Sequence, residues 1–300
     1  MALASERGHD GQDDGSIRLR LDIAYDGTAF RGWGRQPGLR TVQGVLEDTL
    51  ATVFGRLGEP PTLTVAGRTD AGVHALGQVA HLDLSPDQRA GLSRSRPRSG
   101  ASALADRLNG IAGLDTDVWV ASSSIAPPGF DARFSAVWRR YEYRIADADA
   151  PRNPLERAGT LWFPGRLDVG AMDEAAGGLL GLHDWASFCK SREGSTSIRT
   201  LQEFSWSRND AGVLVARVKA DAFCHSMVRA LVGATIAVGQ GRLTATRLLE
   251  LREALARTSE FKVVPAKGLT LMEVGYPDDE DLAARAEQTR AKRDPIGERS

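Results

Sequence analysis

Alternation of apolar and charged residues near the start of the chain is the feature that most constrains the fold. Ile17, Leu19, Leu21 and Ile23 stand on one side of this run, with charged residues between them. Such period-two alternation indicates a β-strand with one buried face. A similar run over residues 268–276 lies near the other end of the chain. The pattern therefore predicts a protein built around a sheet.

Further helices and strands are expected between these two runs. Helical periodicity predicts the helices, and short apolar or alternating runs predict the strands. The predicted helices cover residues 41–54, 101–109, 168–182, 226–238 and 245–255, and the predicted strands cover residues 63–65, 78–84, 118–122, 138–145, 201–208 and 213–219. Thr41 is expected to cap the first helix and Gly55 to end it. Each half follows a similar course of strand, helix and hairpin, which predicts an α/β protein with a pseudo-duplicated sheet.

Composition allows one large domain or two modest ones. The chain has 300 residues, 42% hydrophobic and 26% charged, as is ordinary for soluble globular proteins. Its formal net charge is −1, so any nucleic-acid site has to be a local basic patch. No apolar run approaches the roughly 20 residues of a membrane span, and no signal-peptide core is present.

Cysteine usage bears on the compartment. Two cysteines, Cys189 and Cys224, in a chain of this size indicate a reducing compartment and no disulfide framework. No spacing of His and Cys resembles a zinc site, so no metal is expected. We therefore expect a cytoplasmic protein that does not associate with membranes.

Three segments depart from the pattern of strands and helices. Residues 1–15 are polar and glycine-rich, which predicts a disordered leader. Residues 85–101 hold four arginines among Ser, Pro and Gly, and form either a solvated surface insert or a mobile basic arm. Residues 278–300 form a charged tail, expected to be a frayed helix or disordered.

The loop Ala66–Ala75 is the densest candidate site. It joins two predicted strands and holds five small residues around one carboxylate, Asp70, which follows Arg68 by two positions. Glycine and alanine leave room for a ligand near the backbone. A neighbouring guanidinium favours the ionised carboxylate. The loop is either a plain hairpin in which Asp70 caps a backbone amide, or a ligand-binding loop.

Arg229 is the second unusual residue. It lies in the first turn of the predicted helix over residues 226–238, among Met, Val, Ala and Leu. An unpaired buried charge is very costly, so this arginine needs a partner or solvent. A structural salt bridge, a solvent-facing side chain and a contact with Asp70 are the three possibilities.

Taken together, three motifs resemble the TruA family, the tRNA pseudouridine synthases of the anticodon stem-loop. They are Gly67–His74, Ala132–Ala136 with Arg140 and Tyr141 following, and Ala222–Arg229. Their order and spacing fit from about residue 17 to residue 277. The resemblance implies the pseudouridine synthase fold, with two similar sheet-plus-helix lobes forming a continuous, mostly antiparallel sheet around a central basic cleft. On this basis we expect an N-terminal catalytic lobe over residues 16–115 and a C-terminal lobe over residues 116–277.

The resemblance also implies an activity. Members isomerise uridine to pseudouridine at positions 38, 39 and 40 of tRNA, as homodimers and without metal or organic cofactor. By motif position, Asp70 matches the catalytic aspartate, Tyr141 the tyrosine that packs against the target base, and Arg229 the arginine that pairs with the aspartate. The implied RNA-binding residues are Arg68, Phe130, Asp131, Ala132, Arg133, Phe134, Lys190, Ser191 and Arg192, besides Tyr141.

The chain departs from the family pattern at Gly34, where Gln is common, and at Ser226, where a second His often follows His225. Asp131 stands where His is common and puts a negative charge in an RNA-binding segment. His74, His81 and His225 are interpreted as structural, because an imidazole at a strand or helix start commonly satisfies local backbone.

Two other functions remain as alternatives. One is a tRNA-binding protein of the same fold without catalysis, and the other is a nucleoside hydrolase. Glycoside hydrolysis uses two carboxylates, and the motif set holds only Asp70, which favours isomerisation.

Overall fold

The computed structural model describes residues 15–93, 101–190 and 196–290. The strands are β1 (Ile17–Tyr25), β2 (Thr64–Val65), β3 (His74–Leu84), β4 (Val118–Ile125), β5 (Trp138–Ala146), β6 (Leu161–Trp162), β7 (Gly181–Asp184), β8 (Ile198–Arg208), β9 (Leu214–Ala220) and β10 (Leu269–Gly275). The α-helices are α1 (Val42–Phe54), α2 (Pro86–Ser93), α3 (Ala103–Ala112), α4 (Val169–Gly177), α5 (Met227–Gly239), α6 (Ala245–Glu253) and α7 (Leu282–Arg290). Short 3₁₀ helices are η1 (Gly27–Ala29), η2 (Pro154–Glu156), η3 (Ala186–Phe188), η4 (Ala266–Gly268) and η5 (Asp279–Asp281).

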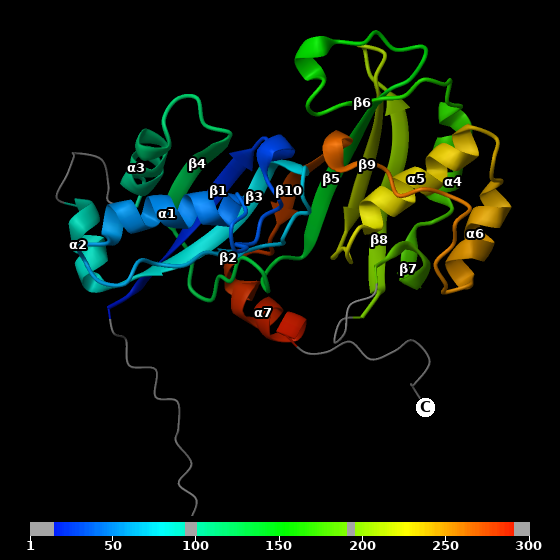
Figure 1. Cartoon of the computed structure of the whole chain (residues 1–300). Helices are drawn as coiled ribbons and strands as arrows, with labels where there is room; N and C mark the ends of the chain where they lie inside the picture. The colour runs from blue at the N-terminus through cyan, green and yellow to red at the C-terminus, as the bar shows by residue number, and fades with distance from the viewer. Residues whose placement is uncertain (1–14, 94–100, 191–195, 291–300) are drawn as a thin grey trace, which may run out of the picture.

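All strands belong to one open sheet in the order β4-β1-β3-β10-β5-β9-β8-β7, with β2 beside β3 and β6 beside β5 (Figure 1). Two pairs, β10 with β3 and β5 with β6, are parallel, and the others are antiparallel. The expected mixed α/β fold with a large, mostly antiparallel sheet is confirmed.

The sheet carries two hydrophobic cores. One packs β1, β3 and β4 against α1 and α3, with Leu21 and Leu50 fully buried, and the other packs β5, β8 and β9 against α4, α5 and α6 around Trp185. These helix groups stand beside opposite ends of the sheet in Figure 1. Strand β4, which the expected boundary at residue 116 assigns to the C-terminal lobe, hydrogen-bonds to β1. Tyr141 packs against both cores, so it lies where they meet.

The expected elements are present, with local corrections. The Thr41 side chain accepts from the amide of Gly44 and caps α1, as predicted. The helix expected over residues 168–182 is wrong at its end, because α4 stops at Gly177 and residues 181–184 form a strand. Two successive glycines, at 177 and 178, weaken the helix there.

Segments outside the sheet are more ordered than expected where the structure describes them. Residues 86–93 of the arginine-rich segment form α2, while residues 94–100 lie outside the described part, as does most of the leader. Part of the tail forms α7, which buries Leu282 and Ala286. No helix in the described ranges is long and apolar enough to cross a membrane.

Gly27 offers a test of how tightly the fold supports the loop before β3. A Cβ at this position would lie 2.0 Å from the carbonyl oxygen of Val73. We expect Gly27→Ala to lower the free energy of unfolding by about 1–3 kcal/mol through overpacking, as measured by urea denaturation.

Gly110→Ala is the matched control. Gly110 lies in α3, and a Cβ there would meet nothing within 4 Å. This variant should gain roughly 0.5–1 kcal/mol, because alanine favours the helix. Equal stability of the two variants would contradict the close approach at Gly27.

Candidate active site

The loop that carries Asp70 lies between β2 and β3 and is held by backbone hydrogen bonds. The amide of Trp33 donates to the carbonyl of Thr69 at 3.1 Å, and the amide of Gly72 donates to the carbonyl of Phe30 at 3.3 Å. The Thr69 hydroxyl lies 2.7 Å from the hydroxyl of buried Tyr25. The loop is therefore fixed against the segment that follows β1. A plain hairpin turn would not need these bonds to a segment outside β2 and β3.

Asp70 meets three side chains that come from the start of α5. Its Oδ2 lies 3.3 Å from Nη1 of Arg229 and 3.5 Å from Oγ of Ser226, and its Oδ1 lies 3.4 Å from Nε2 of His225. Arg229 also donates from Nε to the carbonyl of Val264 at 2.7 Å. Of the three possibilities for Arg229, the structure shows the contact with Asp70. The carboxylate keeps a third of its side-chain surface exposed, at 33%, so a ligand has access to it.

His225 and Ser226 were not among the predicted site residues. His225 was interpreted as structural, yet its ring lies beside the carboxylate and is 46% exposed. Ser226 has a left-handed backbone with φ of 66°, which is uncommon for a residue other than glycine. Such strain gathers at functional sites. A signal was available, because both residues lie inside the third motif.

The other two histidines serve local backbone, as expected. Nδ1 of His74 accepts from the amide of Gly27, and Nδ1 of His81 accepts from the amide of Ala132. Burial lowers the pKa of His81 below its ordinary value, and Arg18 adds to the effect.

The expectation that the two cysteines form no disulfide is wrong. Cys189 and Cys224 form a disulfide, with their Cα atoms 5.7 Å apart, although no disulfide was expected. The fold brings them together because the amide of Lys190 donates to the carbonyl of His225. The residues after η3 therefore border the segment that carries His225.

Tyr141 lies on β5 at the junction of the two cores. Its ring meets the ring of Phe223 edge to face, with 5.2 Å between centroids. Burial raises the pKa of its hydroxyl above the ordinary value. The tyrosine is therefore neutral and presents an aromatic face beside the motif that carries Arg229.

The candidate RNA-binding residues divide by exposure. Arg68, Arg133 and Lys190 are exposed and Phe134 is half-buried, whereas Phe130, Asp131 and Ala132 are buried. Ser191 and Arg192 lie outside the described residues.

Asp131 stabilises the loop that contains it. Its Oδ1 accepts from the amides of Arg133 and Phe134, and its Oδ2 lies 3.1 Å from Nη2 of Arg290. The charge that departs from the family pattern is therefore used within the protein.

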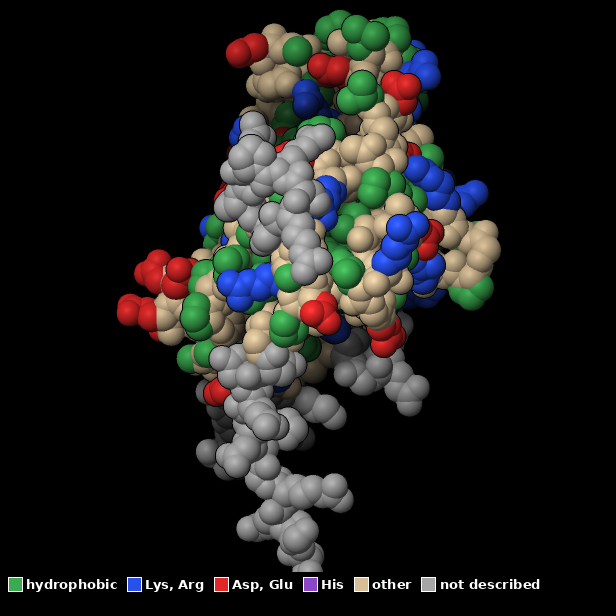
Figure 2. Space-filling model, turned by 90° about the vertical axis from the view of Figure 1, so that its left-hand side faces the viewer, with side chains coloured by type: hydrophobic (Ala, Val, Ile, Leu, Met, Phe, Trp, Pro, Cys, Tyr) green, Lys and Arg blue, Asp and Glu red, His purple; other side chains and the backbone are tan. Residues whose placement is uncertain are grey.

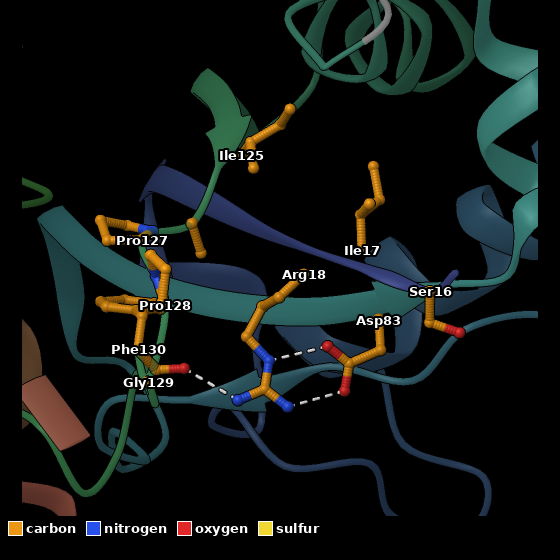
Figure 3. A pocket seen from close by; sticks show the side chains of 10 residues that line it. Ser16, Ile17, Arg18, Asp83, Ile125, Pro127, Pro128, Gly129 and Phe130 are labelled. Atoms are coloured by element: carbon orange, nitrogen blue, oxygen red, sulfur yellow. Dashed lines mark hydrogen bonds and ion pairs between the residues drawn. The ribbon is translucent and has the colours of Figure 1, made fainter. Parts of the chain in front are cut away.

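Two hollows open on the surface. One, of about 420 Å³, is lined by Asp26, Thr28, Gly72, Arg157, Ala158 and Lys267, and so adjoins the Asp70 loop. The other, of about 370 Å³, shares no residue with the Asp70 cluster (Figure 3). There Arg18 donates to both oxygens of Asp83 and to the carbonyl of Phe130. Only the first hollow is placed to extend the candidate site.

Trp162 lies close to the first hollow. It is 36% exposed. Its ring centroid lies 6.0 Å from Nζ of Lys267 and 5.7 Å from Cζ of Arg152. No carboxylate in the described part of the chain forms an ion pair with Arg157 or Lys267. A basic rim with an aromatic side chain thus flanks the Asp70 loop, and sequence patterns did not reveal it.

Charge is mixed at the end of the molecule that faces the viewer in Figure 2. This face carries Lys and Arg side chains interspersed with Asp and Glu side chains. Within the described ranges, no group of three His, Cys, Asp or Glu side chains is arranged to hold a metal ion.

Comparison with known proteins identifies the family. A family model described as tRNA pseudouridine synthase matches residues 175–277. The tRNA pseudouridine synthase A of Leifsonia xyli subsp. xyli is 62% identical over 284 residues, which cover 93% of this chain and 99% of that protein. The tRNA pseudouridine synthase A of Frankia casuarinae is 55% identical over 282 residues, which cover 94% of this chain and 97% of that protein. The chain belongs to the tRNA pseudouridine synthase A family.

Ser226 provides a test of the strain beside Asp70. Glycine adopts the left-handed conformation found at Ser226 without the Cβ penalty of about 1–2 kcal/mol. Ser226→Gly should therefore be more stable than Ser226→Ala by about 1 kcal/mol, as measured by urea denaturation. In a regular helix the order of the two variants would be reversed. An alanine variant as stable as the glycine variant would show that Ser226 is not strained.

Proposed function

We propose that this protein isomerises uridine to pseudouridine at positions 38, 39 and 40 in the anticodon stem-loop of tRNA, with Asp70 as the catalytic residue. Membership of the tRNA pseudouridine synthase A family supports the reaction and the tRNA substrate. The observation that carries the assignment of the site is the contact of 3.3 Å between Asp70 and Arg229. This contact brings two family motifs from distant parts of the chain to one point.

The reaction moves the base without losing any atom. The bond between N1 of uracil and C1′ of ribose breaks, the base turns, and C5 bonds to C1′, while the proton on C5 leaves and N1 gains one. A stacked base is out of reach, so the nucleotide first flips out, at a cost of a few kcal/mol. Small residues in the Asp70 loop leave room for it.

Asp70 then acts on the flipped nucleotide through its carboxyl group. Arg229 contacts this group at 3.3 Å and keeps it in place. Two roles fit this geometry, attack on the sugar and removal of a sugar proton. In both, the carboxylate accepts from the hydroxyl of Ser226 and lies beside the ring of His225.

Tyr141 covers one face of the uracil in this proposal. Its neutral ring lies at the junction of the two cores and excludes water from the detached base. Hydrolysis of the bond would call for a second carboxylate to activate water. In the described residues, the bonded partners of Asp70 are an arginine, a histidine and a serine. Isomerisation is therefore favoured over hydrolysis.

Exposed cations around the loop are proposed to bind the tRNA backbone. Arg68, Arg133 and Lys190 would contact phosphates, and Phe134 offers a surface for stacking. Phe130, Asp131 and Ala132 would support this segment from within. The rim formed by Arg157 and Lys267 extends the same surface beside Gly72.

We also propose that two copies of the chain form a homodimer, which size-exclusion chromatography with light scattering would test.

Replacement of the carboxylate is the direct test of catalysis. Asp70→Asn keeps the shape of the side chain and removes its charge. We expect pseudouridine formation on unmodified tRNA to fall by at least about 10³-fold, measured by tritium release from C5-labelled uridine, with tRNA binding retained. Asp210→Asn, in the turn between β8 and β9, should keep full activity.

Each alternative function has its own outcome. Free uracil released by the native protein would indicate a nucleoside hydrolase. Binding of tRNA without any pseudouridine would indicate a protein that has lost catalysis. An active Asp70→Asn variant would remove the assignment of Asp70.

The rim is tested by its salt dependence. Removing both cations with Arg157→Ala and Lys267→Ala should weaken tRNA binding about tenfold and flatten the slope of log affinity against log salt by about 2, near 1 for each phosphate contact. The maximal rate at saturating tRNA should stay unchanged. Arg56→Ala with Arg242→Ala removes two exposed cations elsewhere and should leave the slope as it is. An unaltered slope in the first double variant would exclude the rim from the tRNA site.

A further inference from the structure

Arg139 makes an unusual set of hydrogen bonds. This residue lies on β5, and its guanidinium donates to three backbone carbonyls. Nη1 donates to Asp221 at 2.9 Å, and Nη2 donates to Ala66 at 2.8 Å and to Arg133 at 3.1 Å. All three acceptors belong to loops outside β5, so one side chain fastens three separate segments.

Each of these segments leads into a motif. Ala66 opens the loop that carries Asp70, and the Nε atom of Arg139 lies 4.0 Å from where a Cβ of Gly67 would be. Asp221 begins the segment that carries His225 and continues into α5. Arg133 belongs to the segment proposed to meet RNA. Arg139 therefore bonds to one family motif and to the residue directly before each of the other two.

The three groups that accept hydrogen bonds from Arg139 are neutral backbone carbonyls, although its side chain is charged. Burial lowers the pKa of the Arg139 guanidinium below its ordinary value, so the site is costly for a cation. No described carboxylate forms an ion pair with it. The carboxylate of nearby Asp221 accepts instead from the amides of Thr200 and Ala222. The planar guanidinium explains why an arginine stands at this position, because it bonds three backbone carbonyls at once.

The strand places Arg139 next to the candidate active site. Residues two apart share a face of a strand, so Arg139 and Tyr141 project to the same side of β5. Arg140 projects to the other side, where it forms an ion pair with Glu273 at 2.9 Å. The two adjacent arginines thus have the same charge and different roles.

We propose that Arg139 is a positioning residue for pseudouridine formation, which sets the Asp70 loop and the His225 segment at the distance that catalysis requires. The inference rests on the proposed function of Asp70. Arg139 acts through these loops and touches neither the base nor the sugar. A misplacement of about 1 Å at a reacting group costs about 10²-fold in rate, so the effect of losing the three bonds is large enough to measure.

The test compares Arg139→Lys and Arg139→Ala with the native enzyme. Lysine keeps the charge, but a single ammonium does not replace a planar fork that spans three carbonyls. We expect the single-turnover rate on bound tRNA to fall about 10²-fold in both variants, while the dissociation constant for tRNA changes less than threefold. Free guanidinium, at concentrations far below those that unfold the protein, should partly restore the rate of the alanine variant.

Arg140→Lys and Arg140→Ala are the matched controls. They remove a guanidinium from the same strand without touching the three carbonyls, so their rate should stay within threefold of native and should not respond to guanidinium. Thermal unfolding of every variant separates a folding defect from a positioning defect. If Arg139→Ala does not fold, Arg139→Lys decides the matter.

The outcomes separate this inference from the function on which it rests. A native enzyme that makes no pseudouridine refutes the proposed function itself. An active native enzyme with a fully active Arg139→Lys variant refutes the positioning role alone. An Arg139 variant that binds tRNA more weakly but keeps its single-turnover rate would also overturn the positioning role, because Arg139 would then act on RNA.

Discussion

The contact between Asp70 and Arg229 joins residues that are 159 positions apart in the sequence, so the fold has to bring two distant segments together. Strand β10, from the end of the fold, lies between β3 and β5 and runs parallel to β3. Strand β10 and the segment before it contact the surroundings of both residues. The carbonyl of Val264 accepts from Arg229, and Leu271 pairs with Ala75 at the end of the Asp70 loop. This part of the chain therefore links the two cores near the point where Asp70 and Arg229 meet.

Local periodicity explains how much of the fold was predictable. Strand β1 and helix α1 follow from alternation and from a capping threonine, since both signals lie within a few residues. The end of α4, the short strand β7 and the packed helix α7 did not follow, because partners distant in sequence decide them. Strand β7 exists through its pairing with β8, and α7 through the burial of Leu282.

The site was predictable where chemistry is tied to a motif. The meeting of Asp70 and Arg229 was implied by the family resemblance, whereas the apolar surroundings of Arg229 alone left three possibilities open. His225 lies beside them within the third motif, but the left-handed backbone of the next residue, Ser226, is a feature that a sequence pattern does not show. The disulfide between Cys189 and Cys224 is another such feature, since two loops from different elements bring the sulfurs together. Burial of Phe130 and Asp131 likewise depends on packing against α7 and neighbouring strands.

A net charge of −1 does not conflict with binding a polyanion, because pairing decides which cations act on the surroundings. Away from the Asp70 loop, several arginines are paired with carboxylates, as Arg40 is with Asp117 and Arg247 is with Glu260. Such exposed pairs contribute little to stability. Their effect on the electric field is larger, since each cancels a charge that would attract RNA to the wrong surface. Around the loop, Arg157 and Lys267 form no ion pair in the described ranges, so in the site that we propose their charges remain free to act on tRNA phosphates.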